Sequence, residues 1–75
     1  MRIRSILLGL GREVRALRTQ KKLSQEALAD MAGIHTNVVG RLERGKHNPT
    51  VDTLCRIAGQ LNVTLADLFA GAEKR

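Results

Sequence analysis

Hydrophobic residues recur every three or four positions through most of the chain, the spacing that places them on one face of an α-helix. In the first segment Arg residues fill positions between them, and the apolar positions are Leu7, Leu10, Val14 and Leu17. We expect an amphipathic helix that ends near residue 19 or 20, with Gly9 and Gly11 weakening its first turn.

Capping residues divide the next part of the chain into two short helices. Ser24 precedes an amphipathic run over 25–32 as a helix N-cap, and Gly33 follows it, where a left-handed residue can end a helix. A third segment then runs to Gly45, the next glycine that can end a helix. All three segments are predicted to be helical.

Two more helices follow a polar turn. Thr50 is the N-cap of a fourth helix that ends at Asn62, a residue that tolerates the left-handed exit. Thr64 caps a last short helix over 65–69, and Asp67 stands where the acid of a capping box would. The buried stripe of the fourth helix is Leu54, Ile57, Ala58 and Leu61.

No alternation of apolar and polar residues predicts a strand, so we expect an all-α, compact five-helix domain over residues 1–70 with a tail over 71–75. A chain of 75 residues is near the lower limit for a stable single core, which favours oligomerisation. Hydrophobic residues make up 43% and charged residues 27%, which argues against disorder. Phe69 is the single aromatic residue, so the core should be aliphatic.

The stretch GIHTNVVGRLERGK, residues 33–46, is a poor helix former, because Val, Asn, Thr and Gly rank low in helix propensity. A helix persists there only if tertiary packing holds it. Two short helices joined by a glycine-containing turn describe a helix-turn-helix, here over residues 25–44. Ala29 is small where the following helix crosses it, and Val39 and Leu42 anchor that helix.

Three segments, LSQEALADMAGI, RLERGKHNP and LNVTLADLF, resemble the most recognisable segments of the lambda repressor and Cro class of DNA-binding domains, also called the XRE family. The resemblance covers about residues 10–69, in the usual order and spacing. It implies a lambda-repressor-like fold and a transcriptional regulator that binds double-stranded DNA. The second helix of the motif would then enter the major groove.

That second helix would turn its polar side toward the base edges. The resemblance gives the base-reading role to Thr36, Asn37 and Arg41, and Gly40 would let the backbone approach the DNA. The guanidinium fork of Arg41 suits guanine N7 and O6, and the alternative is an exposed or phosphate-bound arginine. Val38 is a further candidate through a thymine methyl group, although partial packing is the stronger interpretation.

Phosphate contacts would position this helix on the duplex. Gln25 stands at the N-terminus of the first helix of the motif, where an anion is favoured, and resembles the phosphate-binding glutamine of the family. His35 lies at the next N-cap, as a weak cap or as another phosphate ligand. The phosphate candidates that follow the second helix of the motif are Arg44, Lys46, His47 and Asn48. The alternative is that these four residues form a solvated turn without contact to DNA.

Glu43 is an acidic residue on a helix that would face DNA, so phosphates would repel it unless it points elsewhere. In the family that the chain resembles, the matching glutamate pairs with an arginine of the first helix, and Arg18 occupies that position. We therefore expect an inward ion pair between Arg18 and Glu43 with a structural role.

One such domain reads too few base pairs to specify a genomic site, which favours a homodimer on a palindromic operator. The expected dimer interface, unless these residues simply close the core, is Leu65, Leu68 and Phe69. A second apolar set lies within residues 1–9 and consists of Ile3, Ile6 and Leu8. It extends the first helix, packs on a partner or stays mobile, and the pattern does not decide between these.

The net charge is +6, and all of the excess lies in residues 1–22, where seven basic residues stand against a single acid. Such a helix is either a solvated face or attracts an anionic partner. The alternative function is an antitoxin or another protein-interaction module that also binds DNA. RNA binding is disfavoured, because exposed aromatic stacking residues are absent.

Cys55, His35 and His47 are too few and too scattered for a metal site. No acid, base and nucleophile stand together, so we expect neither an enzyme nor a cofactor. A lone cysteine fits a reducing cytoplasm. The apolar start of the chain is interpreted as a helix rather than a signal peptide, and no apolar run approaches the roughly 20 residues of a transmembrane helix.

Overall fold

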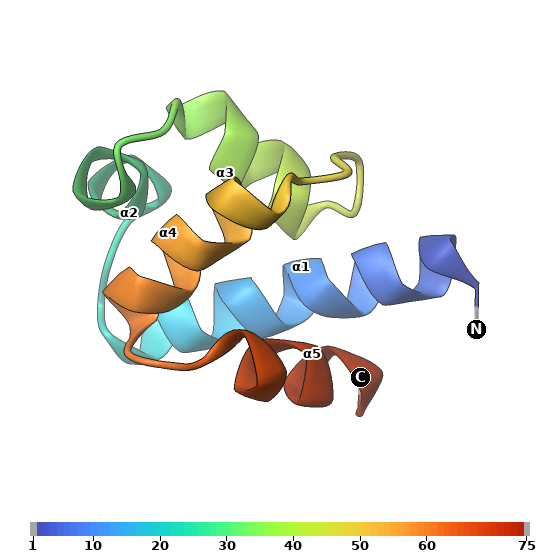
Figure 1. Cartoon of the computed structure of the whole chain (residues 1–75). Coiled ribbons are helices and arrows are strands. Elements are labelled where there is room, and N and C mark those ends of the chain that lie inside the picture. Colours follow the sequence, from blue (N-terminus) through green and yellow to red (C-terminus); the bar gives the residue numbers. More distant parts are fainter. Residues whose placement is uncertain (1, 75) are drawn as a thin grey trace.

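The computed structural model describes residues 2–74, which form five helices around one core (Figure 1). They are α1 (Ile3–Gln20), α2 (Gln25–Ala32), α3 (Thr36–Glu43), α4 (Val51–Leu61) and α5 (Leu65–Glu73). These described residues contain no strand, so the predicted all-α fold is confirmed. In Figure 1, α1 runs across the molecule, with α3 and α4 above it and α5 below.

The predicted capping residues stand at the starts of the short helices. Ser24 Oγ accepts a hydrogen bond from the amide of Ala27 at 2.9 Å, and Thr50 Oγ1 accepts one from the amide three residues further on at 3.1 Å. Thr64 and Asp67 form the two reciprocal bonds of a capping box, at 3.0 and 3.2 Å. These bonds satisfy amide groups that have no partner inside their own helix, which is why the boundaries fall where the sequence predicts them.

Two helices end in the left-handed conformation, as predicted. Gly33 has φ +70° after α2, and Asn62 has φ +59° after α4. The end of α5 is different, because the helix continues beyond Phe69 and buries Ala72 to 4% exposure. The expectation of a tail over residues 71–75 is therefore wrong for 71–73, and residue 75 lies outside the described part of the chain.

Gly9 and Gly11 allow α1 to pack closely between α5 and α3. A Cβ atom at Gly9 would overlap the carbonyl oxygen of Ala72 in α5. A Cβ atom at Gly11 would overlap the carbonyl oxygen of Leu42 and lie 2.8 Å from that of Glu43, at the end of α3. These glycines thus do more than weaken the helix, since neither position has room for a side chain.

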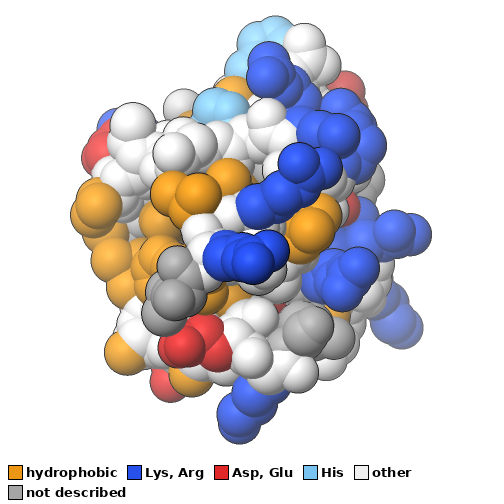
Figure 2. Space-filling model, turned by 90° about the vertical axis from the view of Figure 1, so that its right-hand side faces the viewer, with side chains coloured by type: hydrophobic (Ala, Val, Ile, Leu, Met, Phe, Trp, Pro, Cys, Tyr) orange, Lys and Arg blue, Asp and Glu red, His pale blue; other side chains and the backbone are white. Residues whose placement is uncertain are grey.

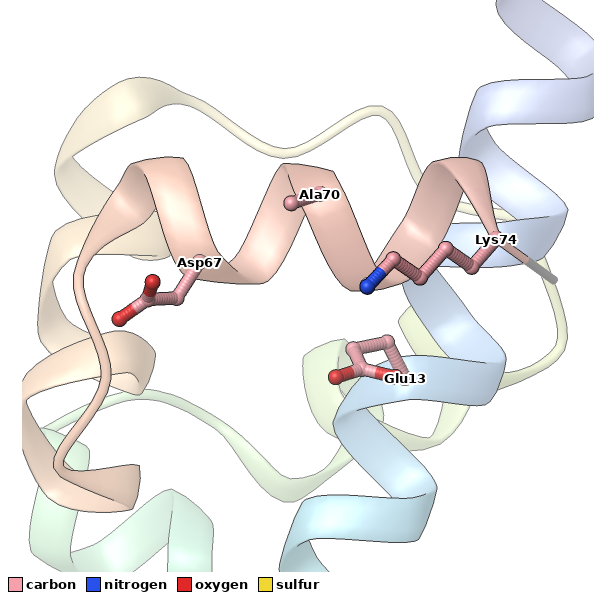
Figure 3. A pocket seen from close by; sticks show the side chains of 5 residues that line it. Glu13, Asp67, Ala70 and Lys74 are labelled. Carbon is pink, nitrogen blue, oxygen red and sulfur yellow. The ribbon is translucent and has the colours of Figure 1, made fainter.

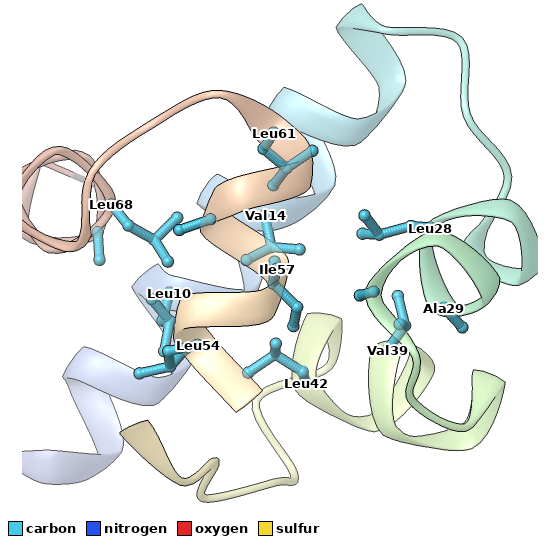
Figure 4. Packing of buried hydrophobic residues seen from close by; sticks show 13 residues of the cluster. Leu10, Val14, Leu28, Ala29, Val39, Leu42, Leu54, Ile57, Leu61 and Leu68 are labelled. Atoms are coloured by element: carbon cyan, nitrogen blue, oxygen red, sulfur yellow. The ribbon is translucent and has the colours of Figure 1, made fainter. Parts of the chain in front are cut away.

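The core is aliphatic, as predicted, and it joins all five helices (Figure 4). Val39 and Leu42 of α3 are both fully buried in it, which gives this poor helix former the tertiary packing that it needs. The largest fully buried side chains are those of Leu10, Leu28, Leu42, Ile57, Leu61, Leu68, Val14 and Val39. This packing holds one side of α3 inside the protein and leaves the other side outward.

Candidate nucleic-acid interface

A histidine caps the start of α3. His35 has extended backbone angles, and its Nδ1 atom accepts a hydrogen bond from the amide of Asn37 at 3.1 Å. Because Nδ1 is the acceptor, the neutral ring carries its proton on Nε2, which is left for an acceptor outside the helix. His35 is thus an N-cap in this structure, and a phosphate contact through Nε2 stays a prediction.

The two faces of α3 differ in polarity. Val39 and Leu42 on the inner face have an exposed fraction of 0%. Asn37 and Arg41 are exposed, and Thr36 is half-buried. The three residues that were predicted to read bases therefore reach the surface together at one side of the domain.

The outward surface of α3 is slightly hollow. The depression has a volume of about 240 Å³, and its lining residues are Gln25, Thr36, Asn37, Gly40, Arg41 and Arg44. Gly40 is itself buried, because side-chain atoms of Gln25 and Arg44 lie 3.4 Å from the position that its Cβ would take. These two side chains cover Gly40 in this structure, and the approach of its backbone to DNA stays a prediction. Val38 is half-buried, which fits its predicted packing role.

Glu43 is held by Arg18 of α1. Arg18 Nε donates to Glu43 Oε2 at 2.6 Å, and Nη2 donates to Oε1 at 2.9 Å. The two side chains are only 11% and 4% exposed. The hydrogen bond to Glu43 raises the pKa of Arg18 above its ordinary value, although burial acts in the opposite direction. The structure thus contains the expected inward pair, and the guanidinium stays charged at neutral pH.

Gln25 joins this pair, a contact not predicted from the sequence. Its Nε2 atom donates to Glu43 Oε1 at 3.0 Å. A second Nε2 hydrogen remains, and Gln25 is the first residue of α2, so it can still donate to an anion at that helix end. The sequence feature that could have predicted the Gln25 contact is Glu43, because a buried carboxylate accepts more hydrogen bonds than one arginine fork supplies.

The four phosphate candidates that follow α3 do not lie together. Arg44 and Lys46 are exposed and line a hollow beside the start of α1. Asn48 instead lines a separate groove with almost entirely apolar walls, and His47 is half-buried. Of the four, only Arg44 and Lys46 are brought to one site by the fold.

This apolar groove, which we call the α1–α4 groove, has a volume of about 230 Å³. Ile3 and Ile6 of α1, Val51 of α4 and Phe69 of α5 contribute to its lining. Ile3 and Val51 are 64% and 69% exposed, so they are apolar side chains that the core does not cover. The first turns of α1 thus extend the helix and also present an apolar surface.

The residues predicted to form a dimer interface separate into two groups. Leu68 is 0% exposed and belongs to the core, so its prediction as an interface residue is wrong. Leu65 and Phe69 are half-buried and pack against the core from outside. Helix α5 closes the core with one side and leaves part of these two residues accessible.

Basic and apolar side chains gather on different parts of the surface. In the view of Figure 2, hydrophobic side chains lie mainly on the left, and Lys and Arg side chains extend from the top through the centre and down the right-hand side. The two kinds of side chain meet at the start of α1, where Ile3 and Leu7 line both the apolar groove and the hollow that contains Arg44 and Lys46.

A larger depression, of about 470 Å³, lies between α1 and α5 (Figure 3). Two carboxylates, from Glu13 and Asp67, and one amine, from Lys74, line it. This excess of acid makes it unsuitable for phosphates. Within residues 2–74 no three His, Cys, Asp or Glu side chains could hold a metal ion, and no helix there is long and apolar enough to cross a membrane.

Comparison with known proteins identifies the family of the chain. The HTH_3 family model, described as helix-turn-helix, matches residues 14–68. Control protein C.SmaI of Serratia marcescens is 39% identical over 60 residues, which cover 80% of this chain and 71% of that protein. The uncharacterized HTH-type transcriptional regulator YazB of Bacillus subtilis (strain 168) is 38% identical over 64 residues, or 85% and 91% of the two chains.

A solved structure shares the fold as well. The restriction-modification controller protein C.AhdI from Aeromonas hydrophila superposes with a TM-score of 0.80 and 37% identity, over 83% of this chain and 94% of the other. The chain therefore belongs to the HTH_3 helix-turn-helix family, of the XRE or Cro/C1 type, and is a DNA-binding transcriptional regulator of that family.

Proposed function

We propose that the protein binds a palindromic or pseudopalindromic operator as a homodimer, with α3 of each protomer in the major groove. The observation that carries this proposal is the polar outward face of α3, whose inner residues Val39 and Leu42 are fully buried. An α-helix with its side chains is about 10 to 12 Å across, which fits a major groove about 12 Å wide.

Arg41, Asn37 and Thr36 are the proposed base-reading residues. They line one depression, so a single base-pair step can meet more than one of them. The Arg41 guanidinium makes only a 3.5 Å contact with the carbonyl oxygen of Lys46, which leaves its fork available for guanine. Because Val38 is half-buried, its contact with a thymine methyl group is secondary.

Gln25 and Arg44 are the proposed phosphate ligands next to the reading residues. Both line the same depression. Gln25 is the first residue of α2, and Arg44 is the C-cap residue directly after α3. The free amide groups at the start of α2 add a favourable field for an anion. These contacts would set the depth and direction of α3 without reading sequence.

A second copy of the chain is the proposed partner of the α1–α4 groove and of the accessible parts of Leu65 and Phe69. Two exposed apolar side chains, Ile3 and Val51, stand at this groove, and their burial would stabilise a dimer by about 25 cal/mol for each Å² removed from water. No residue that lines the depression on α3 also lines this groove, so the pair could form while both α3 helices stay open to DNA.

The test is selection of bound fragments from random-sequence duplex DNA. We expect a consensus of two inverted half-sites whose centres are about one helical turn apart, or a multiple of it. Such a consensus reports sequence preference, symmetry and spacing in one measurement. Equal recovery of all sequences would contradict sequence-specific binding, and a consensus with one unpaired half-site would contradict the dimer.

A further inference from the structure

The beginning of α1 has no DNA-binding role in the function proposed above. The family match starts at Val14, whereas α1 starts at Ile3, so residues 3–13 form regular helix ahead of the matched region. This stretch carries the basic residues Arg4 and Arg12. Its packing against the rest of the protein determines which of its side chains lie near α3.

Leu8 holds this stretch against the chain that leaves α3. Its Cδ2 atom lies 2.6 Å from the place that a Cβ atom at position 45 would take, so a side chain there would displace the end of Leu8. Gly45 also has φ +71°, a conformation that favours glycine. The start of α1 and the turn after α3 are therefore in contact at Leu8 and Gly45.

Arg4 lies one helical turn before Leu8, on the same side of α1. The hollow between the start of α1 and the turn after α3 has a volume of about 280 Å³, and Arg4, Arg44 and Lys46 all line it. All three residues are exposed, and within residues 2–74 none of them forms a salt bridge. Three cations thus share one hollow without an acid, an arrangement that repulsion disfavours until an anion binds.

Arg44 connects this hollow with the reading face of α3. It lines the depression that contains Asn37 and Arg41, and it also lines the hollow that contains Arg4. The Lys and Arg side chains on the right of Figure 2 form a band rather than isolated points. An anion in the hollow would therefore lie directly beside DNA that is bound to α3.

We propose that Arg4, together with Arg44 and Lys46, forms an additional site for a DNA backbone phosphate, next to the base pairs that α3 reads. The proposal rests on the operator binding proposed above. The planar forks of Arg4 and Arg44 suit phosphate oxygens, and Lys46 adds a compact positive charge. Residues 3–13 thus lengthen the contact with the backbone and add affinity without adding sequence preference.

The test compares Arg4→Gln with Arg2→Gln on the duplex obtained by the selection above. Both variants remove one positive charge from the start of the chain, but Arg2 is the extended residue before α1 and does not line the hollow. We expect Arg4→Gln to weaken binding about three- to tenfold and to reduce the slope of log K against log salt by about 0.9 per protomer. The selected consensus should stay the same, and Arg2→Gln should leave the slope unchanged.

Two further measurements separate a direct contact from an indirect effect. Arg4→Lys keeps the charge and should retain the wild-type slope. A series of duplexes, each with one neutral methylphosphonate, should contain a position that weakens the wild type but not Arg4→Gln. Thermal unfolding should be the same for all three variants, because Arg4 and Arg2 are exposed.

Equal affinity and slope for Arg4→Gln and the wild type would overturn the Arg4 site and leave operator binding intact. The absence of any methylphosphonate position that depends on Arg4 would overturn the direct contact as well. If the wild type shows no preference for any duplex, the failure lies in the proposed operator binding instead.

Discussion

At the scale of single residues, the contacts of Glu43 keep its negative charge away from the DNA-binding surface. Glu43 would repel phosphates if it were exposed, but Arg18 and Gln25 satisfy it at distances of 2.6 to 3.0 Å. Removing one partner of such a pair is costly, because the other charge then stays buried without solvent and without a partner. The same contacts tie the end of α3 to α1 and α2.

We expect Glu43→Ala to lower the free energy of unfolding by about 3 kcal/mol, because it leaves Arg18 buried without its partner. Urea denaturation followed by circular dichroism measures this change. The control is Asp52→Ala, which breaks the Asp52–Arg56 pair, whose side chains are 75% and 50% exposed. Asp52→Ala should lower the free energy of unfolding by no more than about 0.5 kcal/mol. Equal losses in the two variants would contradict a structural role for Glu43.

Arg41→Ala should weaken binding to the selected operator by about 1 to 3 kcal/mol, because it removes a base-edge contact. Its affinity for an unrelated duplex should change little. Fluorescence anisotropy with both duplexes gives the two values. Arg56→Ala, on the exposed side of α4, serves as a charge-matched comparison. An equal loss on both duplexes would reassign Arg41 to a phosphate.

At the scale of the helices, their ends could be predicted because caps act locally. Ser24, Thr50 and Thr64 bond to amides three residues further on, and such contacts can be read from the neighbouring sequence alone. The true end of α5 could not be predicted in this way. It depends on the contact between Ala72 and Gly9, which lie far apart in the sequence.

A pair of glycine substitutions tests how closely the helices pack. Gly11→Ala should destabilise the protein by about 2 to 3 kcal/mol, because its methyl group would meet the carbonyl oxygens of Leu42 and Glu43 at the end of α3. The methyl group of Gly59→Ala would meet nothing within 4 Å at an exposed position of α4, so this variant should stabilise the protein by about 0.5 to 1 kcal/mol. Thermal unfolding should move in opposite directions for the two variants. A neutral Gly11→Ala would show that α1 and α3 are not in close contact.

At the scale of the whole molecule, the apolar groove and the reading depression of α3 have no lining residue in common. A partner protein in the groove would therefore leave that depression open to DNA. Leu68 illustrates why the groove could not be predicted in detail. It lies one residue from Phe69, yet one side chain enters the core and the other remains partly accessible.

Val51→Asp should give a folded monomer, because it places a charge on a 69% exposed residue at the proposed dimer surface. Light scattering measures the mass, and operator affinity should fall as the second half-site is lost. Met31→Asp is the matched control, since Met31 is 48% exposed on α2 and does not line the groove. A dimer that persists in Val51→Asp would place the interface elsewhere.

Periodicity and capping residues were sufficient to predict five helices and the helix-turn-helix, because both act over a few neighbouring residues. The resemblance of three segments added the Arg18–Glu43 pair and the residues proposed to read bases. Packing between distant segments determined the rest: that Gly40 is covered, that Leu68 is core, and that Arg4 stands beside Arg44 and Lys46. These features depend on how each helix is rotated against its neighbours, and that rotation is set by contacts across the whole core.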